Sequence, residues 1–339
     1  MSAVYGGIDL HSNNSVVVLE DHEGGVLYRR RLENDLRSIT AALEPYRERL
    51  KAIVVESTYN WYWLVDGLMA SGYRVELANP SAIQQYNGLK YTDDDSDAQW
   101  LAEMLRLGIL PTGYIYPKQE RAVRDLLRKR TQLVRQRTAN ILSVQNLVAR
   151  NTGTRMKGDA VKRLQAQDCE QLVEQADVAL AMAVTVRVRE CLDGEIAKLE
   201  KVVLERVKLR AEFIKLKTIP GVGDILALTI MLEAGDIARF ASVGDFASYC
   251  RCVGSKKLTN FKKKAVGNTK NGNEYLGWAF MEAANFAVRY SPPIQRWHQR
   301  KKARTNAIVA IKAVAHKLAR AAYYMLRDQV EFDVSKAFS

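Results

Sequence analysis

The middle third of the chain constrains the fold most, because two long stretches there lack the residues that end helices. From Glu120 to Arg150 there are 31 residues without Gly or Pro, and apolar residues recur at helical spacing. This stretch predicts a helix about 45 Å long. Asn151-Thr152-Gly153 ends it, and a second stretch, Cys169 to Lys217, again lacks Pro.

The second stretch carries an apolar stripe through which such a helix packs against another helix. The stripe recurs at spacings of 4, 4, 3 and 4 and consists of Val188, Leu192, Ile196, Leu199 and Val203. Two long helices with such stripes pair either as an antiparallel hairpin within one chain or as a coiled coil between chains. The sequence leaves both alternatives open.

The first hundred residues predict one mixed α/β domain. Short β-prone runs are separated by turn residues, so the first three predict an antiparallel meander. Asp35 then caps a helix that turns Ile39 and Leu43 inward. The expected strands are Val4–Leu10, Ser15–Glu20, Val26–Leu32, Lys51–Glu56 and Tyr73–Ala78, and the later helices are Tyr62–Met69 and Asp95–Leu107, the last with Trp100, Leu101, Met104 and Leu105 inward.

The region from Lys217 onward predicts a small, mainly helical domain. Its first feature is the turn Ile219–Gly223, whose two glycines would let backbone amides face outward and hold a DNA phosphate. The alternative role of such a turn is a plain connection between two helices. An exposed loop is expected over Ser255–Asn273, followed by helices over Tyr275–Ala287 and Thr305–Leu326. The inward face of the last helix is expected to carry Ile308, Ile311, Ala315 and Leu318. The predicted domains are therefore 1–115, 116–216 and 217–339.

The distribution of charge points to a polyanionic partner. The whole chain has a net charge of +13, yet residues 1–110 hold 10 Lys and Arg against 16 Asp and Glu. Residues 118–150 hold nine basic against two acidic residues, and residues 251–320 hold 16 against two. Solubility alone does not require such segregation, so nucleic acid is the expected partner.

Candidate phosphate contacts follow from these basic segments. On the middle helix they share one face, for which a solvated helix surface is the alternative role. In the expected C-terminal loop the candidates are lysines that lie on either side of residues with a hydroxyl group. The candidates are Arg121, Arg124, Arg128, Lys256, Lys257, Lys262, Lys263, Lys264 and Lys270.

Several protein classes are excluded by the sequence. No apolar run approaches the roughly 18 residues of a membrane span, and Asp9, His11 and Glu20 interrupt any signal peptide. The four cysteines form no Cys-x-x-Cys pair, which argues against a disulfide framework and a zinc site. We therefore expect a cytosolic protein with reduced thiols.

Four carboxylates are the candidate catalytic groups. Asp9 ends the first strand, Glu56 ends the fourth, and Asp94 and Asp97 lie three residues apart at the start of a helix. The first and fourth strands are expected to be neighbours with the last helix beside them, so the four carboxylates converge. Because like charges raise one another's pKa, divalent cations about 3.5–4 Å apart are the usual reason for such a group. Hard oxygen ligands fit two Mg²⁺ ions rather than Zn²⁺.

Each carboxylate also has a purely structural alternative. Asp9 can cap the following turn, and Glu56 can be a solvated strand end. Negative charge at a helix start is favourable in itself, which accounts for Asp93 and Asp95. The combination with Asp9 and Glu56 favours the catalytic interpretation for Asp94 and Asp97.

The motifs resemble those of the DEDD transposases of insertion sequences, a family that includes relatives of the Piv DNA invertase. The N-terminal motifs are Gly-Ile-Asp at Asp9, Glu56 after Val-Val, and Asp-x-x-Asp-Ala from Asp94. The C-terminal motifs are Ile219–Gly223, Arg239-Phe240 through Tyr249, the Ser255–Phe261 loop and Lys270–Leu276. The resemblance covers about residues 4–325.

This resemblance implies an α/β RuvC-like (RNase H-like) N-terminal domain, a coiled-coil linker and a small helical C-terminal transposase domain. It implies that Asp9, Glu56, Asp94 and Asp97 bind Mg²⁺. It further implies a noncoding bridge or seek RNA that pairs with target and donor DNA, and a tetramer of two dimers in the bacterial cytoplasm, associated with the nucleoid during the reaction. The family's loop serine forms a covalent link to DNA.

The sequence departs from the family at that nucleophile. Counting forward from Tyr249, Thr259 stands where the serine is expected, and Ser255 is the second candidate. Threonine is a competent but bulkier hydroxyl nucleophile. Three functions therefore stay open: an RNA-guided recombinase with a covalent intermediate, a RuvC-like junction endonuclease that uses water, and a non-catalytic nucleic-acid-binding relative.

Overall fold

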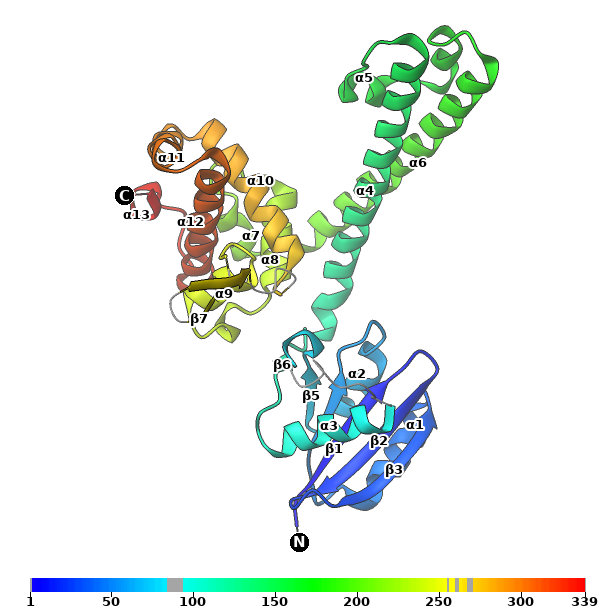
Figure 1. The fold of residues 1–339 in the computed structure, drawn as a ribbon, viewed down its shortest axis with the longest axis vertical. Helices are drawn as coiled ribbons and strands as arrows, with labels where there is room; N and C mark the ends of the chain where they lie inside the picture. Colours follow the sequence, from blue (N-terminus) through cyan, green and yellow to red (C-terminus); the bar gives the residue numbers. More distant parts are fainter. Residues whose placement is uncertain (1, 84–93, 255, 260–261, 267–270, 339) are drawn as a thin grey trace. The chain divides into compact units, whose positions relative to one another are not determined.

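The computed structural model describes residues 2–83, 94–254, 256–259, 262–266 and 271–338, and for Ser81, Asp94, Asp95 and residues 256–259 and 262–266 it describes the backbone alone. The chain forms two compact units, Met1–Lys118 and Gln119–Ser339 (Figure 1). The second unit holds both the long helices of the middle region and the C-terminal helices. An α/β first unit and a mostly helical remainder agree with the predicted fold class.

The first unit is built on a six-stranded sheet in the order β3-β2-β1-β4-β5-β6. Strands β1, β2 and β3 are antiparallel, whereas β4 pairs in parallel with β1 and β5 pairs in parallel with β4. The predicted meander and the pairing of the first and fourth strands are thus confirmed. The strands are β1 Val4–Leu10, β2 Asn14–Asp21, β3 Val26–Glu33, β4 Leu50–Glu56, β5 Val75–Ala78 and β6 Thr112–Gly113.

Helices cover both faces of this sheet. Helices α1 (Leu36–Leu43) and α2 (Tyr62–Ala70) pack on the face that carries Ile8, Val17, Ile53 and Val55. Helix α3 (Asp94–Arg106) packs on the opposite face through Ala98, Leu101 and Met104, against Val16, Val18, Val54 and Ala78. Short 3₁₀ turns follow α1 at Glu44–Tyr46 and β5 at Pro80–Ala82. Asp35 caps α1 as predicted, by accepting a hydrogen bond from the Ser38 amide.

One of the inward positions predicted for α3 is wrong. Trp100 is exposed, whereas Leu101 and Met104 are buried. Ala98 and Ala102 occupy the line of closest contact with β1, so the helix turns its small residues rather than its largest one toward the sheet.

The closest contact in this unit is between α3 and the bare backbone of β1 at Gly7. A Cβ atom at Gly7 would lie 2.1 Å from the carbonyl oxygen of Ala98 and 2.7 Å from the amide nitrogen of Ala102. Both are backbone atoms of α3, so no side-chain rotation relieves the overlap. Glycine at this position therefore sets how near α3 lies to the sheet.

The second unit begins with an antiparallel pair of long helices, α4 (Lys118–Thr152) and α6 (Ala176–Val207), joined by α5 (Gly158–Arg163) and a 3₁₀ turn, Ala166–Gln171 (Figure 1). Arg130 pairs with Glu200 at 2.6 Å, and Arg137 pairs with Asp193 at 2.9 Å. A step of seven residues forward along α4 thus corresponds to seven residues back along α6. Of the two alternatives that the sequence left open, the hairpin within one chain is observed.

The apolar stripe predicted for the second helix is only partly the packing seam. Ile196 and Val203 are buried, but Val188 is exposed. The buried positions of α6 include Arg189, and the seam also contains the ion-paired Asp193 and Glu200. Apolar periodicity misses these positions because arginines of the partner helix neutralise the carboxylates there. The remaining buried residues of α6 are Ala179, Met182, Ala183, Val186 and Val207.

The rest of the second unit surrounds a core that includes Phe246, Phe280 and Leu318. Its helices are α7 Ala211–Leu216, α8 Asp224–Ala234, α9 Val243–Tyr249, α10 Glu274–Tyr290, α11 Pro292–Arg304, α12 Ala307–Asp328 and α13 Val334–Phe338, with a 3₁₀ turn at Ile237–Arg239. Ile308, predicted to face this core, is 68% exposed. It lies in the first turn of α12, directly after the Asn306 cap, before the helix reaches the core.

Where a loop was expected over Ser255–Asn273, the backbone forms a two-stranded antiparallel sheet. Strand β7 (Lys256–Thr259) pairs with β8 (Lys262–Val266). Lysine-rich strands lack the apolar alternation by which strands are recognised, so the residue pattern carries no sign of this sheet.

The turn Ile219–Gly223 connects α7 to α8 as a tight crossing. Gly221 has φ +82°, and a Cβ atom there would lie 2.5 Å from Cβ of Phe286. The start of α8 already carries a carboxylate of its own, Asp224, whose Oδ1 lies 2.7 Å from Nζ of Lys217. A phosphate at this turn would have to compete with that carboxylate and stays a prediction.

Among the helices that the structure describes, none has both the length and the apolar character that a membrane crossing requires.

We expect Gly7→Ala to destabilise the first unit by about 3 kcal/mol or more, because the added methyl group overlaps two backbone atoms of α3. The matched control is Gly6→Ala on the other face of β1. There the nearest atom is the flexible Leu19 Cδ2 at 3.0 Å, so the cost is smaller. Urea unfolding of the two variants measures the difference, and equal loss in both would contradict the close approach of α3.

Candidate carboxylate site

Two of the four predicted carboxylates lie side by side on the sheet. Strands β1 and β4 are in register with Ile8 opposite Val55, so Asp9 and Glu56 occupy neighbouring positions. Side chains alternate between the faces of a strand, which places both carboxylates on the face covered by α3. Asp9 is only 3% exposed.

The third carboxylate reaches this pair from α3. Asp97 precedes Ala98, the residue in closest contact with β1, and lies near enough for its charge to act on Glu56. Asp94 is the first residue of α3, and its side chain lies outside the described residues. The structure therefore brings together Asp9, Glu56 and Asp97, each from a different element.

The electrostatics of Glu56 show how unfavourable this arrangement is for charge. Burial, a hydrogen bond with the Asp9 carboxyl group and the negative charges of Asp9 and Asp97 together raise the pKa of Glu56 to about 7. All of these causes act in the same direction. At neutral pH the site thus holds carboxylates that compete for protons or for a cation.

Polar residues hold Asp9 and the residue His11, which follows β1, in place. Nε2 of His11 lies 3.1 Å from Oδ2 of Asp9. The His11 carbonyl oxygen accepts hydrogen bonds from Nδ2 of Asn34 at 3.0 Å and of Asn60 at 2.9 Å. Asn60 in turn accepts one from Thr58 Oγ1 at 2.8 Å.

Asn34 ties the segment after β1 to the segment after β3, and Asn60 ties it to the segment after β4. Sequence reasoning missed both. Their positions in the sequence could have indicated them, because Asn60 follows the end of β4 by four residues and Asn34 follows β3 directly.

The donor set has the chemistry of a divalent-cation site. Its groups are carboxylate oxygens, the ligands that Mg²⁺ and similar hard cations prefer. The side chains that the structure describes contain no group of three or more His, Cys, Asp or Glu residues close enough to hold a metal ion, and Asp94 is not among them. A bound cation would relieve the repulsion that raises the pKa of Glu56. The chemistry of the donors, which are carboxylate oxygens, fits a hard cation.

The candidate phosphate contacts on α4 point inward rather than to solvent. Arg121 and Arg124 are buried, and Arg128 donates from Nε and Nη2 to both oxygens of Glu233 at 2.6 and 2.7 Å. A solvent-facing position is therefore wrong for Arg121 and Arg124, whereas Arg128 is half-buried and its phosphate contact stays a prediction. Arg128 binds the buried carboxylate of Glu233, and counting charges along the sequence does not reveal such a partner.

The remaining predicted residues lie in the segment between α9 and α10. Thr259, Lys256 and Lys257 belong to β7, and Lys262, Lys263 and Lys264 belong to β8, with only their backbone described. Ser255 and Lys270 lie outside the described residues. Their predicted roles stay predictions.

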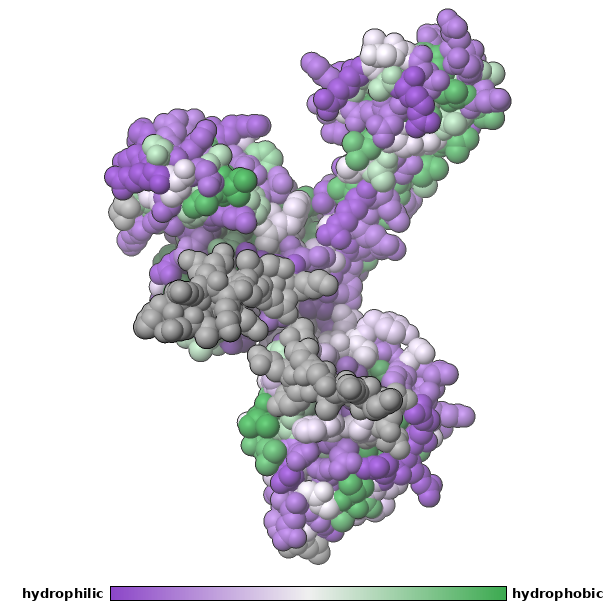
Figure 2. All heavy atoms as spheres, viewed as in Figure 1, coloured by the Kyte–Doolittle hydropathy of each residue, from purple (hydrophilic) through white to green (hydrophobic). Residues whose placement is uncertain are grey.

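A basic surface that the structure does describe lies on the C-terminal helices. Residues 283–327 contain ten Lys and Arg and neither Asp nor Glu, and they form the second half of α10, all of α11 and most of α12. The surface over α11 is mostly hydrophilic in the view of Figure 2. We call this set the α11–α12 basic surface, and its exposed members are Arg289, Arg296, Arg300, Lys302, Arg304, Lys312, Arg320 and Arg327.

The raised pKa of Glu56 gives a pH-dependent prediction for the protein with divalent ions chelated. The unfolded chain ionises Glu56 near pH 4.5 and the folded one near 7, so this residue costs stability progressively as pH rises from about 4.5 to about 7. Glu56→Gln removes that cost. We expect its Tm to exceed the wild-type value by a few degrees at pH 8 and to equal it near pH 4.5.

The control for this measurement is Glu48→Gln, at an exposed position of the same unit. Thermal unfolding followed by circular dichroism at both pH values gives the result. A Glu56→Gln variant that is less stable than wild type at pH 8 would disprove the proposed repulsion.

Comparisons with known proteins agree with this geometry. The family model for the DEDD transposase domain of IS110 elements, described as "Transposase", matches residues 6–151. A second model, "Transposase IS116/IS110/IS902 family", matches residues 214–299. A DEDD-type domain implies dependence on a divalent metal, in accord with the carboxylate donors at Asp9, Glu56 and Asp97.

Curated relatives extend the similarity over most of the chain. A "Probable family 20 transposase" of Pseudomonas aeruginosa is 24% identical over 330 residues, 94% of this chain and 96% of the relative. The transposase for insertion sequence element IS1328 of Yersinia enterocolitica is 23% identical over 94% of this chain and 95% of its own length. The transposase for IS1111A of Coxiella burnetii is 24% identical over 84% and 78%, respectively. Because both domain models match in order and the curated relatives cover most of the chain, the chain belongs to the DEDD-type transposases of IS110-group insertion sequences.

Proposed function

We propose that this transposase is an RNA-guided DNA recombinase that cuts and rejoins strands through a covalent protein–DNA intermediate. The observation that carries the proposal is the convergence of Asp9, Glu56 and Asp97 in the domain that matches the DEDD family model. The antiparallel β1–β3 meander with β4 parallel to β1 supports a RuvC-like assignment for this domain.

The carboxylates supply the metal-binding part of the mechanism. Asp9, Glu56, Asp94 and Asp97 would hold two Mg²⁺ ions, which activate the attacking oxygen and stabilise the leaving oxygen of a phosphodiester when bound. His11 beside Asp9, with Asn34 and Asn60 on its carbonyl oxygen, orients Asp9 toward that site.

The hydroxyl group of Thr259 is the proposed nucleophile, with Ser255 as the alternative. Its oxygen attacks the phosphorus, an O–P bond to the protein forms, and the bond from phosphorus to one sugar oxygen breaks. The hydroxyl proton leaves to solvent, and the released sugar oxygen takes up a proton. The number of phosphoester bonds is unchanged, so the link can be reversed by a hydroxyl group of another DNA strand to complete rejoining.

The proposed partners are a noncoding guide RNA and double-stranded target and donor DNA. The α11–α12 basic surface and the lysines of β7 and β8 are the proposed contacts with phosphate. We further propose that the α4–α6 pair takes part in a coiled-coil assembly of two dimers, in which the carboxylates of one protomer act with the loop hydroxyl of another.

Trapping of the covalent intermediate tests the function directly. Purified protein is combined with its element's RNA, labelled DNA and Mg²⁺, and a denaturing gel scores the protein–DNA adduct. We expect an adduct with wild type and with Ser255→Ala, and loss of the adduct with Thr259→Ala and with Asp97→Asn.

The outcomes separate the remaining functions. Cutting without any adduct would favour a junction endonuclease that hydrolyses DNA with water. Absence of any Mg²⁺-dependent cutting would favour a non-catalytic nucleic-acid-binding protein. An adduct that disappears with Ser255→Ala but persists with Thr259→Ala would reassign the nucleophile, and adduct formation without the RNA would remove guidance from the proposal.

The α11–α12 basic surface gives a prediction for nucleic-acid affinity. Arg300→Ala/Lys302→Ala should weaken binding and lower the slope of log affinity against log salt by roughly 0.9 for each phosphate that is no longer neutralised. The control, Arg155→Ala/Lys157→Ala, removes the same charge from exposed positions near α5. Fluorescence anisotropy at several salt concentrations measures both, and equal slopes in the two variants would exclude this surface from the interface.

A further inference from the structure

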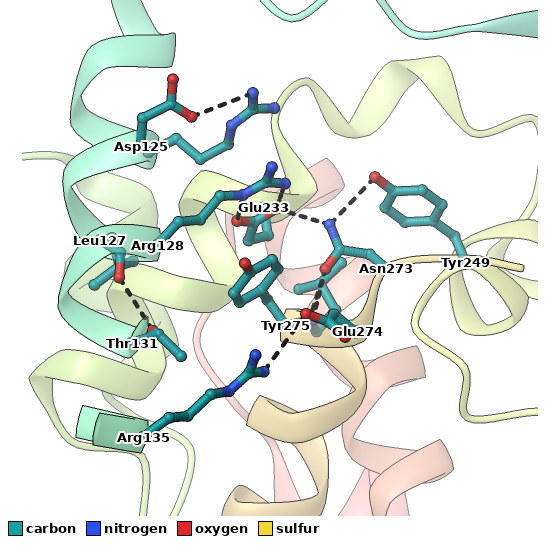
Figure 3. Close-up of polar contacts among 12 residues, drawn as sticks. Asp125, Leu127, Arg128, Thr131, Arg135, Glu233, Tyr249, Asn273, Glu274 and Tyr275 are labelled. Carbon is teal, nitrogen blue, oxygen red and sulfur yellow. Dashed lines mark hydrogen bonds and ion pairs between the residues drawn. The ribbon is translucent and has the colours of Figure 1, made fainter. Parts of the chain in front are cut away.

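Three elements of the second unit meet at one buried carboxylate, Glu233 of α8 (Figure 3). Glu233 is 3% exposed. Arg128 of α4 donates to both of its oxygens at 2.6 and 2.7 Å, and Nδ2 of Asn273 donates to Oε2 at 2.7 Å. The carboxylate thus has a charged partner and a neutral partner that come from different parts of the chain.

Asn273 is the residue at which the segment carrying Ser255 and Thr259 ends. It caps α10, since its Oδ1 accepts hydrogen bonds from the amides of Tyr275 and Leu276 at 2.9 and 3.0 Å. Its own backbone amide donates to the carbonyl oxygen of Tyr249, the last residue of α9, at 2.6 Å. One residue therefore joins the beginning of α10 to the end of α9.

The two ends of the segment between α9 and α10 meet at a place that we call the segment base. Residues next to Asn273 form further contacts there. Gly272 has φ +89°, and a Cβ atom there would lie 2.5 Å from the carbonyl oxygen of Tyr249. Nε of Arg251 donates to the carbonyl oxygen of Gly272 at 3.2 Å. The two ends of the segment between α9 and α10 are held against each other, with Glu233 directly beneath them.

Helix α4 contacts the first turn of α10 at two further points on the same face. The Arg128 guanidinium lies 4.8 Å from the ring centroid of Tyr275. Seven residues further along α4, Nη2 of Arg135 lies 3.5 Å from Oε1 of Glu274. Figure 3 shows both arginines pointing from α4 toward these residues. Helix α4 and the segment base therefore share one contact region, in which the half-buried Arg128 reaches the buried Glu233.

Stability alone does not explain an ion pair at this place between a buried glutamate and a half-buried arginine. Replacing such a pair by well-packed neutral groups is often neutral or even stabilising, because desolvation offsets the attraction between the charges. An arginine that forms two parallel hydrogen bonds to a carboxylate does fix direction, since the planar guanidinium allows one geometry. The pair is suited to holding orientation.

We propose that Arg128 is a positioning residue, which sets the segment bearing Thr259 and Ser255 relative to the α4–α6 hairpin through Glu233 and Asn273. This rests on the proposed function, in which a hydroxyl group of that segment attacks DNA. Arg128 itself touches neither the DNA nor the reacting atoms in this proposal. It acts through the cap of α10, so its loss changes the rate of the covalent step rather than the affinity for DNA.

The decisive variant is Arg128→Met/Glu233→Gln. Arg128→Met alone leaves Glu233 buried without its charged partner and is expected to unfold more easily. The double variant removes both charges, and the new side-chain amide oxygen still accepts from Asn273, so its Tm is expected to stay near the wild-type value. The matched control is Arg135→Met, which breaks the exposed pair on the same face of α4.

Two readouts are taken on the full chain. Hydrogen exchange of peptides covering residues 271–277 reports the closure of the segment base, and we expect exchange about tenfold faster in the double variant. Single-turnover adduct formation at saturating DNA reports the chemical step, and we expect a rate at least about tenfold lower with DNA affinity unchanged. Arg135→Met is expected to match wild type in both.

Wild-type exchange in the double variant would overturn the proposal, whatever the activity. Faster exchange with a wild-type adduct rate would also overturn it, because closure of the base would then not position the hydroxyl group. If wild type itself forms no adduct, the proposed function fails and the rate of DNA cutting replaces adduct formation. If wild type neither forms an adduct nor cuts, positioning for reaction is overturned together with the function.

Discussion

The contact of α3 with the bare backbone of β1 at Gly7 is the constraint on which the carboxylate site depends. Side chains hold a helix away from the backbone of the sheet on which it packs. Here backbone meets backbone, because Ala98 and Ala102 face a residue without a side chain. Asp97 directly precedes Ala98. The close approach that requires glycine at position 7 therefore also brings the Asp97 carboxylate near Asp9 and Glu56.

The molecule buries carboxylates in two contrasting ways. Glu233 is matched by Arg128 and Asn273, with each of its oxygens accepting a hydrogen bond at 2.6–2.7 Å. Glu56 has other carboxylates as neighbours, and each of them raises its pKa. The buried Glu233 is neutralised by an arginine, whereas the half-buried Glu56 lies among like charges and is therefore suited to bind a cation or a proton.

Local patterns made the first unit predictable. Alternating strands and turn residues indicated the order of its elements, and the strand order then placed Asp9 beside Glu56 with α3 nearby. Charged residues were harder to place, since composition does not tell whether an arginine meets water or a carboxylate. The sequence therefore predicts a phosphate contact or a solvated surface for Arg128, which binds Glu233, and it does not indicate Asp193 and Glu200 as part of the hairpin seam.

The same reason explains β7 and β8. Their lysines indicated an exposed loop because strand recognition relies on apolar alternation, whereas backbone hydrogen bonds alone define this two-stranded sheet. The role of Thr259 depends on chemistry that neither pattern nor backbone geometry determines. It stays a prediction.

The ion pairs between α4 and α6 have a consequence for how the hairpin can change in evolution. Arg130–Glu200 and Arg137–Asp193 repeat after seven residues on each helix, in opposite directions. A single inserted residue in one helix shifts every later pair out of alignment and turns its arginines away from their partners. Seven residues added to both helices at facing positions leave the alignment intact and lengthen the rod by about 10 Å. The alignment of the ion pairs is therefore preserved only when both helices of the hairpin change in length by the same number of residues.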